Sequence, residues 1–443
     1  MSMLKDYFKN KLRTGKLFKS LLKELQLSEN FSKQEMRNFH NEKLQKIMKI
    51  AFTNIPYYQQ VMKSRNLTFQ DIKNVDDLKR LPLIDKTIVR ENFQEFRNTQ
   101  HKGPIFKGLS SGTTGRSGVY LRDIRSINFE NAVLWRLYQK VGKKVNSRRV
   151  TLRGELPCSI DQKEPPFWRV NRFSKELIMS SFHLNDTNMS AYVDEINKYR
   201  PYDLHAYPAS AYLLAEYCLR MNKNINFEII FTSSETLMPQ QKETIEKAFN
   251  GKVCDIYGQA ERVAMIIHNE FGDYNIIEDY SIVELLPIED GRYEVIGTTL
   301  NNYLMPLIRY RTGDIVEMNS KEYDDKYVSF RSVKQVMGRF DTHLKTPDGR
   351  KFGAAALSMI PKGVDNIIES QFVQKQLGEV ILRIVCTKDF SDKDELKLKN
   401  NINKYLSKEI RVFIEKVKSI PRTKAGKFLL VVDKSNQDLK SDE

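Results

Sequence analysis

The stretch from residue 202 to residue 256 reads YDLHAYPASAYLLAEYCLRMNKNINFEIIFTSSETLMPQQKETIEKAFNGKVCDI, and its pattern decides the fold class. Three short apolar runs in it predict strands, at 202–207, 227–231 and 252–256. Two segments with helical spacing lie between them, at 210–221 and 239–249. Strands that alternate with helices are typical of α/β architecture, so we expect an α/β fold.

The same alternation extends over residues 101–340, which predicts a large α/β domain. Residues 1–100 are rich in Lys, Leu, Phe and Gln and predict a helical N-terminal region packed on this core as a cover. Residues 341–443 supply a strand-like run, a charged helix and a lysine-rich end, enough for a small α+β domain. Within the core, Asp290-Gly291 between two apolar runs predicts a β-hairpin.

The composition describes a basic protein, with 72 Lys and Arg against 56 Asp and Glu and a formal net charge of +16. Such a protein attracts anionic partners: nucleic acid, a membrane surface or a phosphate-rich cofactor. The basic residues are scattered and no zinc finger, RNP or homeodomain pattern occurs, so we expect no nucleic-acid partner. The four widely spaced cysteines, and the lack of a long apolar run, predict a cytoplasmic protein.

The first 28 residues form a basic amphipathic segment. Lysines crowd most of its other positions. The apolar residues recur at roughly helical spacing, and they are Leu4, Phe8, Leu12, Leu17, Leu21 and Leu25. Such a segment can make peripheral contact with an anionic membrane. Packing of its apolar stripe against the protein itself is the commoner arrangement, and the sequence leaves both open.

Leu109 to Gly118 reads LSSGTTGRSG and has the composition of a phosphate-binding loop. Glycines let backbone amides approach an anion, and hydroxyl groups add further donors. No Lys-Ser or Lys-Thr closes the loop, which argues against the common NTPase loop and against a kinase. An ordinary surface turn has a similar composition and is the alternative.

Three further segments place acidic or basic residues where a nucleotide could use them. Tyr257-Gly-Gln-Ala-Glu261 directly follows a predicted strand, where ligands of α/β sheets bind, and Glu261 could hold magnesium. Asp314, at the end of Arg-Thr-Gly-Asp, could accept hydrogen bonds from ribose hydroxyls. Lys427 ends the glycine-containing segment Pro421-Arg-Thr-Lys-Ala-Gly-Lys427. Each is also compatible with an ordinary solvated or turn residue.

Taken together and in this order, these segments resemble the motifs of the adenylate-forming superfamily of acyl-CoA synthetases, adenylation domains and luciferases. Gly338 to Asp341 resembles that family's hinge, and Pro421 to Lys427 its catalytic-lysine segment. Ile-Pro-Tyr-Tyr at 55–58 and Leu-Pro-Leu-Ile-Asp-Lys at 81–86 resemble the phenylacetate-CoA ligase branch and its CapK-like capsule-biosynthesis relatives. The resemblance covers about residues 50 to 430.

The resemblance implies a division of roles. It makes 101–340 an AMP-binding core and 341–443 a mobile domain that carries the catalytic Lys427, with Asp341 as the hinge. It makes Glu261 a catalytic residue and the magnesium ligand, Tyr257 the adenine-stacking ring and Asp314 the ribose ligand. The implied ATP and AMP contacts are Ser110, Ser111, Gly112, Thr113, Thr114, Gly115, Ser233, Ser234, Glu235, Tyr257, Gly258, Asp314 and Arg339. His205 and Tyr207 are expected to line the acyl pocket.

The implied activity is an ATP- and magnesium-dependent ligase that forms an acyl-adenylate and pyrophosphate from a small carboxylic acid. The acyl group would then pass to CoA, an amine or a carrier-protein thiol, in capsule or O-antigen polysaccharide biosynthesis. The sequence departs from the family pattern at Ala260 and Thr342, and its phosphate loop lacks a Pro-Lys ending. The alternative is a membrane-associated assembly or scaffold protein that uses the basic N-terminal segment and has an inactive nucleotide site.

Overall fold

The computed structural model describes residues 14–109, 118–143, 147–159, 162–269, 272–289, 291–318, 330–339, 343–347, 351–353, 357, 360–361, 364–406, 409–422 and 428–435. The chain forms two compact units. The first unit comprises 1–147, 171–176 and 254–336, and the second comprises 148–170, 177–253 and 337–443. The predicted division into three domains, at 1–100, 101–340 and 341–443, stays a prediction, because the two compact units do not test it.

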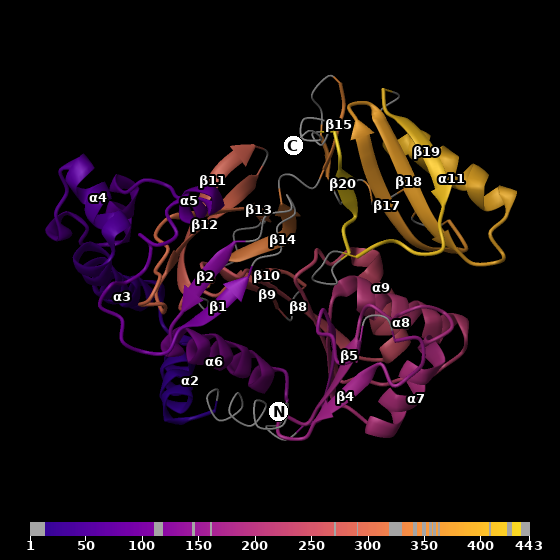
Figure 1. Ribbon diagram of the computed structural model, residues 1–443, viewed down its shortest axis with the longest axis horizontal. Helices are drawn as coiled ribbons and strands as arrows, with labels where there is room; N and C mark the ends of the chain where they lie inside the picture. The colour runs from indigo at the N-terminus through magenta and orange to yellow at the C-terminus, as the bar shows by residue number, and fades with distance from the viewer. Residues whose placement is uncertain are drawn as a thin grey trace. The chain divides into compact units, whose positions relative to one another are not determined.

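The first unit combines N-terminal helices with antiparallel strands (Figure 1). Its helices are α2 (Lys16–Ser28), α3 (Lys33–Asn54), α4 (Pro56–Arg65), α5 (Lys86–Glu91) and α6 (Ile124–Lys140), with short 3₁₀ turns at Phe69–Asp71 and Val75–Arg80. β1 (Phe106–Leu109) and β2 (Val119–Arg122) form a hairpin. Neighbours in the larger sheet follow the order β11 (Ser281–Glu289), β12 (Arg292–Thr299), β13 (Tyr310–Met318), β14 (Ser332–Arg339), β10 (Tyr274–Ile276), β9 (Met265–His268) and β8 (Lys252–Gly258).

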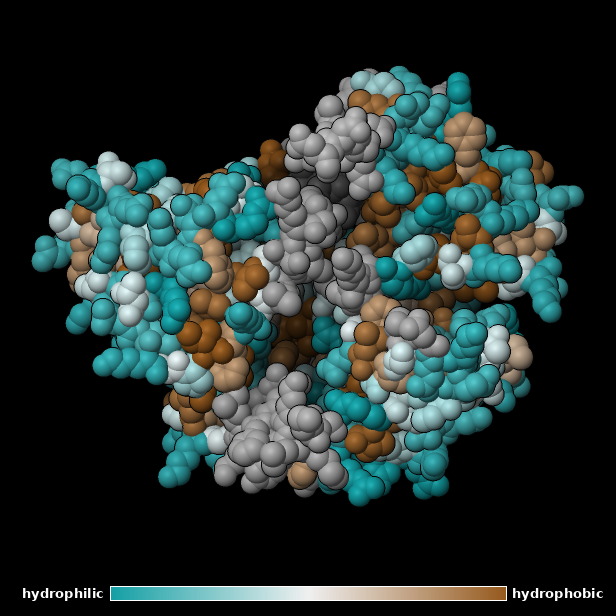
Figure 2. Space-filling view, in the orientation of Figure 1, coloured by the Kyte–Doolittle hydropathy of each residue, from teal (hydrophilic) through white to brown (hydrophobic). Residues whose placement is uncertain are grey.

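Helices α3 and α4 pack on this part of the chain through a shared core. A capping box between Ser32 and Glu35 starts α3, and its buried Leu44, Ile47 and Met48 join a cluster with the segment 300–310. Tyr58 of α4 fixes that segment, because its hydroxyl donates to the Pro306 carbonyl at 3.2 Å and accepts from the Ile308 amide at 2.9 Å. On the face seen in Figure 2, hydrophilic side chains cover most of α3 and α4.

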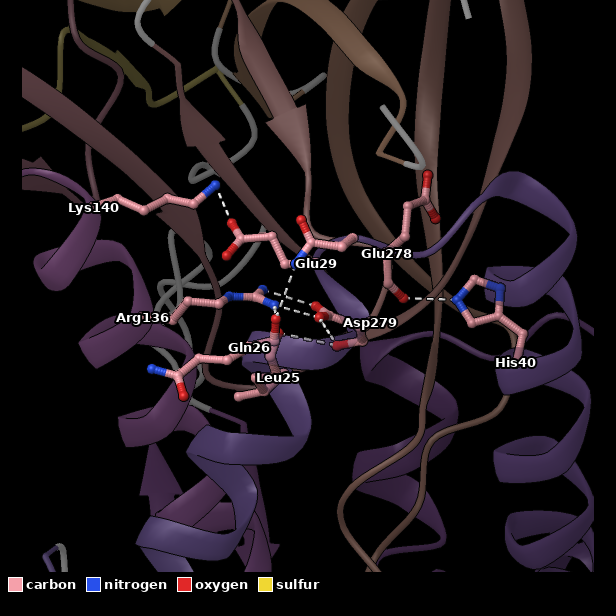
Figure 3. A network of polar contacts seen from close by, with 10 residues as sticks. Leu25, Gln26, Glu29, His40, Arg136, Lys140, Glu278 and Asp279 are labelled. Atoms are coloured by element: carbon pink, nitrogen blue, oxygen red, sulfur yellow. Dashed lines mark hydrogen bonds and ion pairs between the residues drawn. The ribbon is translucent and has the colours of Figure 1, made fainter. Parts of the chain in front are cut away.

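Helix α2 is held against α6 by apolar contacts and by a buried polar network (Figure 3). Phe18, Leu21 and Leu25 are buried along one side of α2. The Arg136 guanidinium of α6 forms a bidentate pair with the Asp279 carboxylate, in which Nη2 and Oδ1 are 2.9 Å apart, and Nη1 also donates to the Leu25 carbonyl at 2.7 Å. The apolar stripe of the described part of the N-terminal segment is therefore packed within the protein.

The second unit begins with the α/β pattern that decided the fold class. Its strands lie in the order β7 (Ile229–Ser233), β6 (Asp203–Ala206), β3 (Arg149–Arg153), β5 (Glu176–Ser180) and β4 (Trp168–Asn171). β3 pairs parallel to β6, and β6 pairs parallel to β7. The helices α7 (Met189–Tyr199), α8 (Pro208–Arg220) and α9 (Pro239–Phe249) share a core cluster with these strands.

The C-terminal part of the second unit contains a separate four-stranded sheet. Its strands follow the order β19 (Arg411–Lys416), β18 (Glu379–Cys386), β17 (Ile367–Gln376) and β20 (Val431–Asp433), and β15 (His343–Lys345) and β16 (Lys351–Gly353) form a small hairpin. Helix α11 (Asp392–Tyr405) covers this sheet, as Figure 1 shows, and buries Leu398 and Ile402 against Phe372 and Leu382.

The predicted fold class is confirmed: the protein is α/β, with a large sheet and a C-terminal α+β part. The helix expected at 239–249 has those bounds, and the strand expected at 252–256 continues to Gly258. The hairpin expected at Asp290-Gly291 joins β11 and β12, and Gly291 has the positive φ of +72° that such a turn requires. Among the described residues, no helix is both long enough and apolar enough to cross a membrane.

Candidate active site

Glu261 lies in a tight turn that directly follows β8. The apolar side chains of β8 are buried, and the chain turns back where the Arg262 amide donates to the Gln259 carbonyl at 3.1 Å. Arg262 has a φ of +57°, and its guanidinium is held by the Ser126 carbonyl at 2.7 Å. The turn leaves Glu261 only 6% exposed. A carboxylate this buried needs a partner, because water can no longer solvate its charge.

The partner of Glu261 is a tyrosine that the sequence did not single out. The Tyr310 hydroxyl donates to Glu261 Oε1 at 3.1 Å, and the Tyr120 hydroxyl lies 2.9 Å from the Tyr310 hydroxyl. Burial, followed by the charge of Glu261, raises the pKa of Tyr310 far above its usual value. The phenol therefore keeps its proton at neutral pH and orients the carboxylate without neutralising its charge.

Tyr257 and Asp314 are brought together by the fold. The Tyr257 hydroxyl donates to Asp314 Oδ2 at 2.7 Å, and Gln259 Nε2 donates to the same hydroxyl at 3.2 Å. Burial and the nearby Asp314 charge raise the pKa of Tyr257 well above its usual value, so the hydroxyl remains a donor. Gly313, with φ at +71°, lets the strand bend before Asp314. Two motifs that are far apart in sequence thus form one polar cluster.

A buried arginine supports the same turn from β2. Arg122 Nη2 donates to the Ala260 carbonyl at 2.7 Å. Burial, together with the nearby Arg262, lowers its pKa to about 10, so the guanidinium remains charged at neutral pH. A Cβ at Gly108 of β1 would lie 2.3 Å from Arg122 Nη2, so a larger residue there would require this guanidinium to move. The hairpin that frames the predicted phosphate loop is therefore connected to the Glu261 turn.

The predicted contacts Ser233, Ser234 and Glu235 lie in the second unit, at and after the end of β7. Ser234 has a φ of +73°, unusual for a residue with a side chain, and its hydroxyl accepts from Arg153 Nη2 at 2.8 Å. Glu235 accepts a hydrogen bond from the Ala209 amide, at the start of α8, with an N–O distance of 3.1 Å. This loop is thus fixed by the protein itself.

His205 and Tyr207, the expected pocket residues, are buried at the end of β6 and just beyond it. His205 Nε2 lies 2.9 Å from Asp203 Oδ2, and the same carboxylate oxygen lies 3.1 Å from Arg149 Nε. The Arg153 guanidinium lies over the Tyr207 ring, with its Cζ 5.5 Å from the ring centroid. These contacts give both residues a packing role, and their place in an acyl pocket stays a prediction.

Several predicted site residues lie outside the described residues. They are the phosphate-loop residues Ser110, Ser111, Gly112, Thr113, Thr114 and Gly115, the hinge residue Asp341, and the catalytic Lys427. Their described neighbours are Leu109 at the end of β1, Gly118 before β2 and Phe428 before β20. Arg339 is the last residue of β14, and Gly258 the last of β8. The roles assigned to all of these residues remain proposals.

The residues around Glu261 fit the way in which proteins hold magnesium beside a nucleotide. Among the described residues, no three His, Cys, Asp or Glu side chains cluster as a metal cage. Magnesium at phosphate sites instead takes one or two carboxylates, with water and phosphate oxygens as its other ligands. A single buried carboxylate oriented by Tyr310 meets that requirement. Glu261 therefore fits a magnesium shared with a phosphate-bearing substrate.

The fold is that of an adenylate-forming ligase. The chain superimposes with a TM-score of 0.70 on 2-hydroxyisobutyryl-CoA ligase, solved in the postadenylation state in complex with R3-HIB-AMP. The two chains are 17% identical, and the match covers 91% of each. The predicted fold family is therefore confirmed by structure.

The relatives in sequence are more specific. The chain is 28% identical over 401 residues to Protein CapK of Staphylococcus aureus. This match covers 89% of this chain and 88% of that protein. It is also 24% identical over 352 residues to the phenylacetate-coenzyme A ligase of Escherichia coli (strain K12). That match covers 71% of this chain and 74% of the enzyme. Residues 344–434 match the family model of the CapK C-terminal domain. These homologues confirm the predicted resemblance and support the prediction of an AMP-forming ligase.

Proposed function

We propose that the protein activates a small carboxylic acid with ATP and then transfers the acyl group to an acceptor. The observation that carries this proposal is the polar cluster of the first unit. The Tyr257 hydroxyl lies 2.7 Å from Asp314 Oδ2, and Glu261 lies buried four residues beyond Tyr257, in the turn that follows β8. A phenol ring, a carboxylate for a ribose and a carboxylate for magnesium are the groups that an ATP site of this family requires.

In the first step, a carboxylate oxygen of the acid would form a bond to the α-phosphorus of ATP, and the bond to the leaving pyrophosphate would break. The Tyr257 ring would bind adenine, and Asp314 would accept hydrogen bonds from the ribose hydroxyls. Glu261 would hold magnesium, which supplies positive charge against the phosphates when it is bound. Lys427 would donate to the charge that develops between the carboxylate and the phosphate.

In the second step, a nucleophile on the acceptor would attack the acyl carbonyl, and AMP would leave. CoA, an amine and a carrier-protein thiol all have the required nucleophile. We propose that this reaction serves capsule or O-antigen polysaccharide biosynthesis, as the resemblance to CapK-like proteins implies. We propose a cytoplasmic location, where ATP is available.

The membrane-scaffold alternative is less well supported. It requires the basic N-terminal segment to present an apolar face to lipid. Phe18, Leu21 and Leu25 are instead buried within the first unit, where α2 packs on α6. In the part of α2 that the structure describes, the apolar stripe is already covered.

The proposal is tested by measuring pyrophosphate release over a panel of aryl, short-chain and amino acids, with magnesium titrated in each assay. We expect Glu261→Gln to raise the magnesium concentration for half-maximal rate by at least about 10-fold, or to abolish turnover, because an amide binds the cation more weakly. Glu317→Gln is the control, since Glu317 pairs with the surface Lys334 at 2.7 Å. A Glu261→Gln enzyme with the wild-type magnesium curve would show that the metal assignment is wrong.

A further inference from the structure

Arg262, the residue after Glu261, has a backbone conformation that the surrounding structure must hold in place. Its φ of +57° lies in the left-handed region, which costs a residue with a side chain about 1–3 kcal/mol. Its guanidinium Nη1 donates to the Ser126 carbonyl at 2.7 Å and to the Ser126 hydroxyl at 3.1 Å. The strained residue of the Glu261 turn is therefore anchored on the first turn of α6.

A carboxylate of α6 compensates the charge of Arg262. Arg262 Nε lies 3.6 Å from Glu130 Oε2, and the two side chains are only 13% and 24% exposed. The Tyr280 hydroxyl donates to the same carboxylate oxygen. Burial, followed by the charge of Glu130, raises the pKa of Tyr280 well above its usual value, so this phenol stays a donor at neutral pH. Glu130 is thereby held in one orientation beside the guanidinium.

The space around this ion pair leaves it little room to move. A cavity of about 10 Å³ borders Ser126, Glu130, Arg262 and Tyr280, which is room for about one water molecule. Charges with so little water around them interact more strongly than charges on the surface. The Asp123 carboxylate also caps α6, because its Oδ1 accepts from the Ser126 amide at 2.7 Å. The anchor of Arg262 is therefore itself fixed.

The other neighbour of Glu261 is held by the same part of the chain. Arg122 Nη2 donates to the Ala260 carbonyl at 2.7 Å, and Arg122 is the residue before the Asp123 cap of α6. The residues on both sides of Glu261 are thus bonded to the segment 122–130. The position of the Glu261 backbone is therefore determined by this segment.

We infer that Arg262 is a positioning residue, whose contacts with Ser126 and Glu130 place the Glu261 carboxylate and so determine the affinity for magnesium. This inference rests on the proposed function, in which Glu261 is the magnesium ligand. Charge alone would act in the opposite sense, because a guanidinium near a metal site repels a cation. The sign of the change in magnesium affinity when Arg262 is removed therefore separates positioning from simple electrostatics.

The test is Arg262→Gly, because glycine adopts a positive φ without strain and the variant removes only the side-chain contacts. The dissociation constant of α,β-methylene-ATP, which cannot release pyrophosphate, is measured in EDTA and in magnesium. The ratio of the first constant to the second gives the magnesium contribution to nucleotide binding. We expect this ratio to fall about 10-fold, while the constant in EDTA stays within about 2-fold of wild type. An unchanged or larger ratio in Arg262→Gly would contradict the inference.

Two further single variants serve as controls. Arg200 of the second unit is an exposed arginine with a similar φ of +51°, so Arg200→Gly removes the same side chain and the same strain outside the Glu261 turn. Its magnesium ratio should match that of wild type. Arg262→Lys disturbs the fold less, and its ratio should fall only about 3-fold, because an ammonium keeps the charge but lacks the fork of a guanidinium. A ratio for Arg262→Lys that equals the wild-type ratio would show that charge, and not geometry, matters at this position.

A double variant asks whether Arg262 acts through Glu261. Adding Arg262→Gly to Glu261→Gln should lower the magnesium ratio by less than about 2-fold more, because coupled residues are not additive. A further full 10-fold loss would show that Arg262 acts independently of Glu261. Wild-type protein that binds the analogue equally well in magnesium and in EDTA would instead contradict the proposed function, so the two failures are distinguishable.

Discussion

Glu261 is oriented by a phenol rather than by a cation. An arginine or lysine on this carboxylate would compete with magnesium for its charge, whereas the Tyr310 hydroxyl donates one hydrogen bond and leaves the charge in place. The Tyr310 hydroxyl in turn lies 2.9 Å from the Tyr120 hydroxyl. The nearby Arg122 contacts the backbone of Ala260 and not the carboxylate. This arrangement suits the proposed role of Glu261 as the magnesium ligand.

We expect Tyr310→Phe to weaken magnesium binding while the acid specificity stays unchanged. Removing a group that orients a metal ligand typically costs about 10-fold in metal affinity. Loss of the buried hydroxyl should also lower the free energy of unfolding by about 1 kcal/mol. The magnesium dependence of pyrophosphate release and the unfolding midpoint in urea check these two effects.

Tyr120→Phe is the matched control for this prediction, because it removes the hydroxyl that lies one step further from the carboxylate. Its effect on the magnesium dependence should be smaller, since the bond from Tyr310 to Glu261 remains. A Tyr310→Phe enzyme with the wild-type magnesium curve would show that Tyr310 only fills space.

The residues of this site differ in how far the sequence could predict them. Tyr257, Glu261 and Asp314 could be proposed from the sequence because they belong to short motifs whose order is informative. Tyr310 directly precedes the Arg-Thr-Gly-Asp motif, and this adjacency is the one local signal that could have found it. Tyr120 and Arg122 carry no such signal, because they reach the site by contacts between residues more than 130 positions apart. Glu235 was predicted as an ATP contact, and its two backbone partners come from α8 and from Phe428.

At the scale of elements, local chemistry determined what could be predicted. Helix α9 begins at Pro239, a residue suited to the first helical turn, and ends before Asn250-Gly251. The β11–β12 hairpin follows from Asp290-Gly291. The pairing of β10 with β14 could not be predicted, because it joins residues 274 and 333 across several intervening strands. The position of β5 between β3 and β4 is likewise a consequence of nonlocal contacts.

The docking of α2 also depends on a nonlocal element, the loop that carries Asp279. Asp279 is fully buried and contacts α2 through the Ser28 hydroxyl, which donates to Oδ2 at 2.6 Å. Arg136 neutralises the carboxylate from α6 and also donates to the last turn of α2. One buried ion pair therefore connects three segments of the first unit.

We expect Arg136→Met to lower the free energy of unfolding by about 3–5 kcal/mol, because it leaves a buried carboxylate without its cation. The double variant Arg136→Met and Asp279→Leu should recover most of this loss, since no buried charge then remains. Chemical denaturation followed by circular dichroism measures both.

Lys140→Ala is the control for this pair. The Lys140 side chain is 58% exposed and pairs with Glu29 at the surface, beside the contact between α2 and α6. Its removal should therefore lower the free energy of unfolding by less than about 1 kcal/mol. A cost below about 1 kcal/mol for Arg136→Met as well would show that water reaches Asp279 and that the pair does not fix α2.

At the scale of the whole molecule, the residues with proposed roles are divided between the two units of the chain. Tyr257, Glu261 and Asp314 belong to the first unit, whereas Glu235 and the chain position of Lys427 belong to the second. In the proposed mechanism, adenylation uses Lys427 and acyl transfer does not. Acyl transfer requires an acceptor to reach the same carbonyl after pyrophosphate has left. We therefore propose that the small C-terminal domain adopts two arrangements, with Asp341 as the hinge.

A proline at the hinge should affect the two half-reactions unequally. Domain rotation about a hinge is absorbed by a few backbone dihedrals, and proline fixes φ near −65°. Asp341→Pro should therefore spare acyl-adenylate formation and slow transfer to the acceptor by about 10-fold or more. Lys388→Pro is the control, because Lys388 follows Thr387 in a turn closed by the Phe390 amide, a position that tolerates proline.

Quenched-flow measurement of both steps decides the outcome. If Asp341→Pro slows both steps by one factor at an unchanged melting temperature, Asp341 is not the hinge. If it slows adenylation alone, proline has excluded the arrangement used for adenylation, and the assignment of the two arrangements must be reversed.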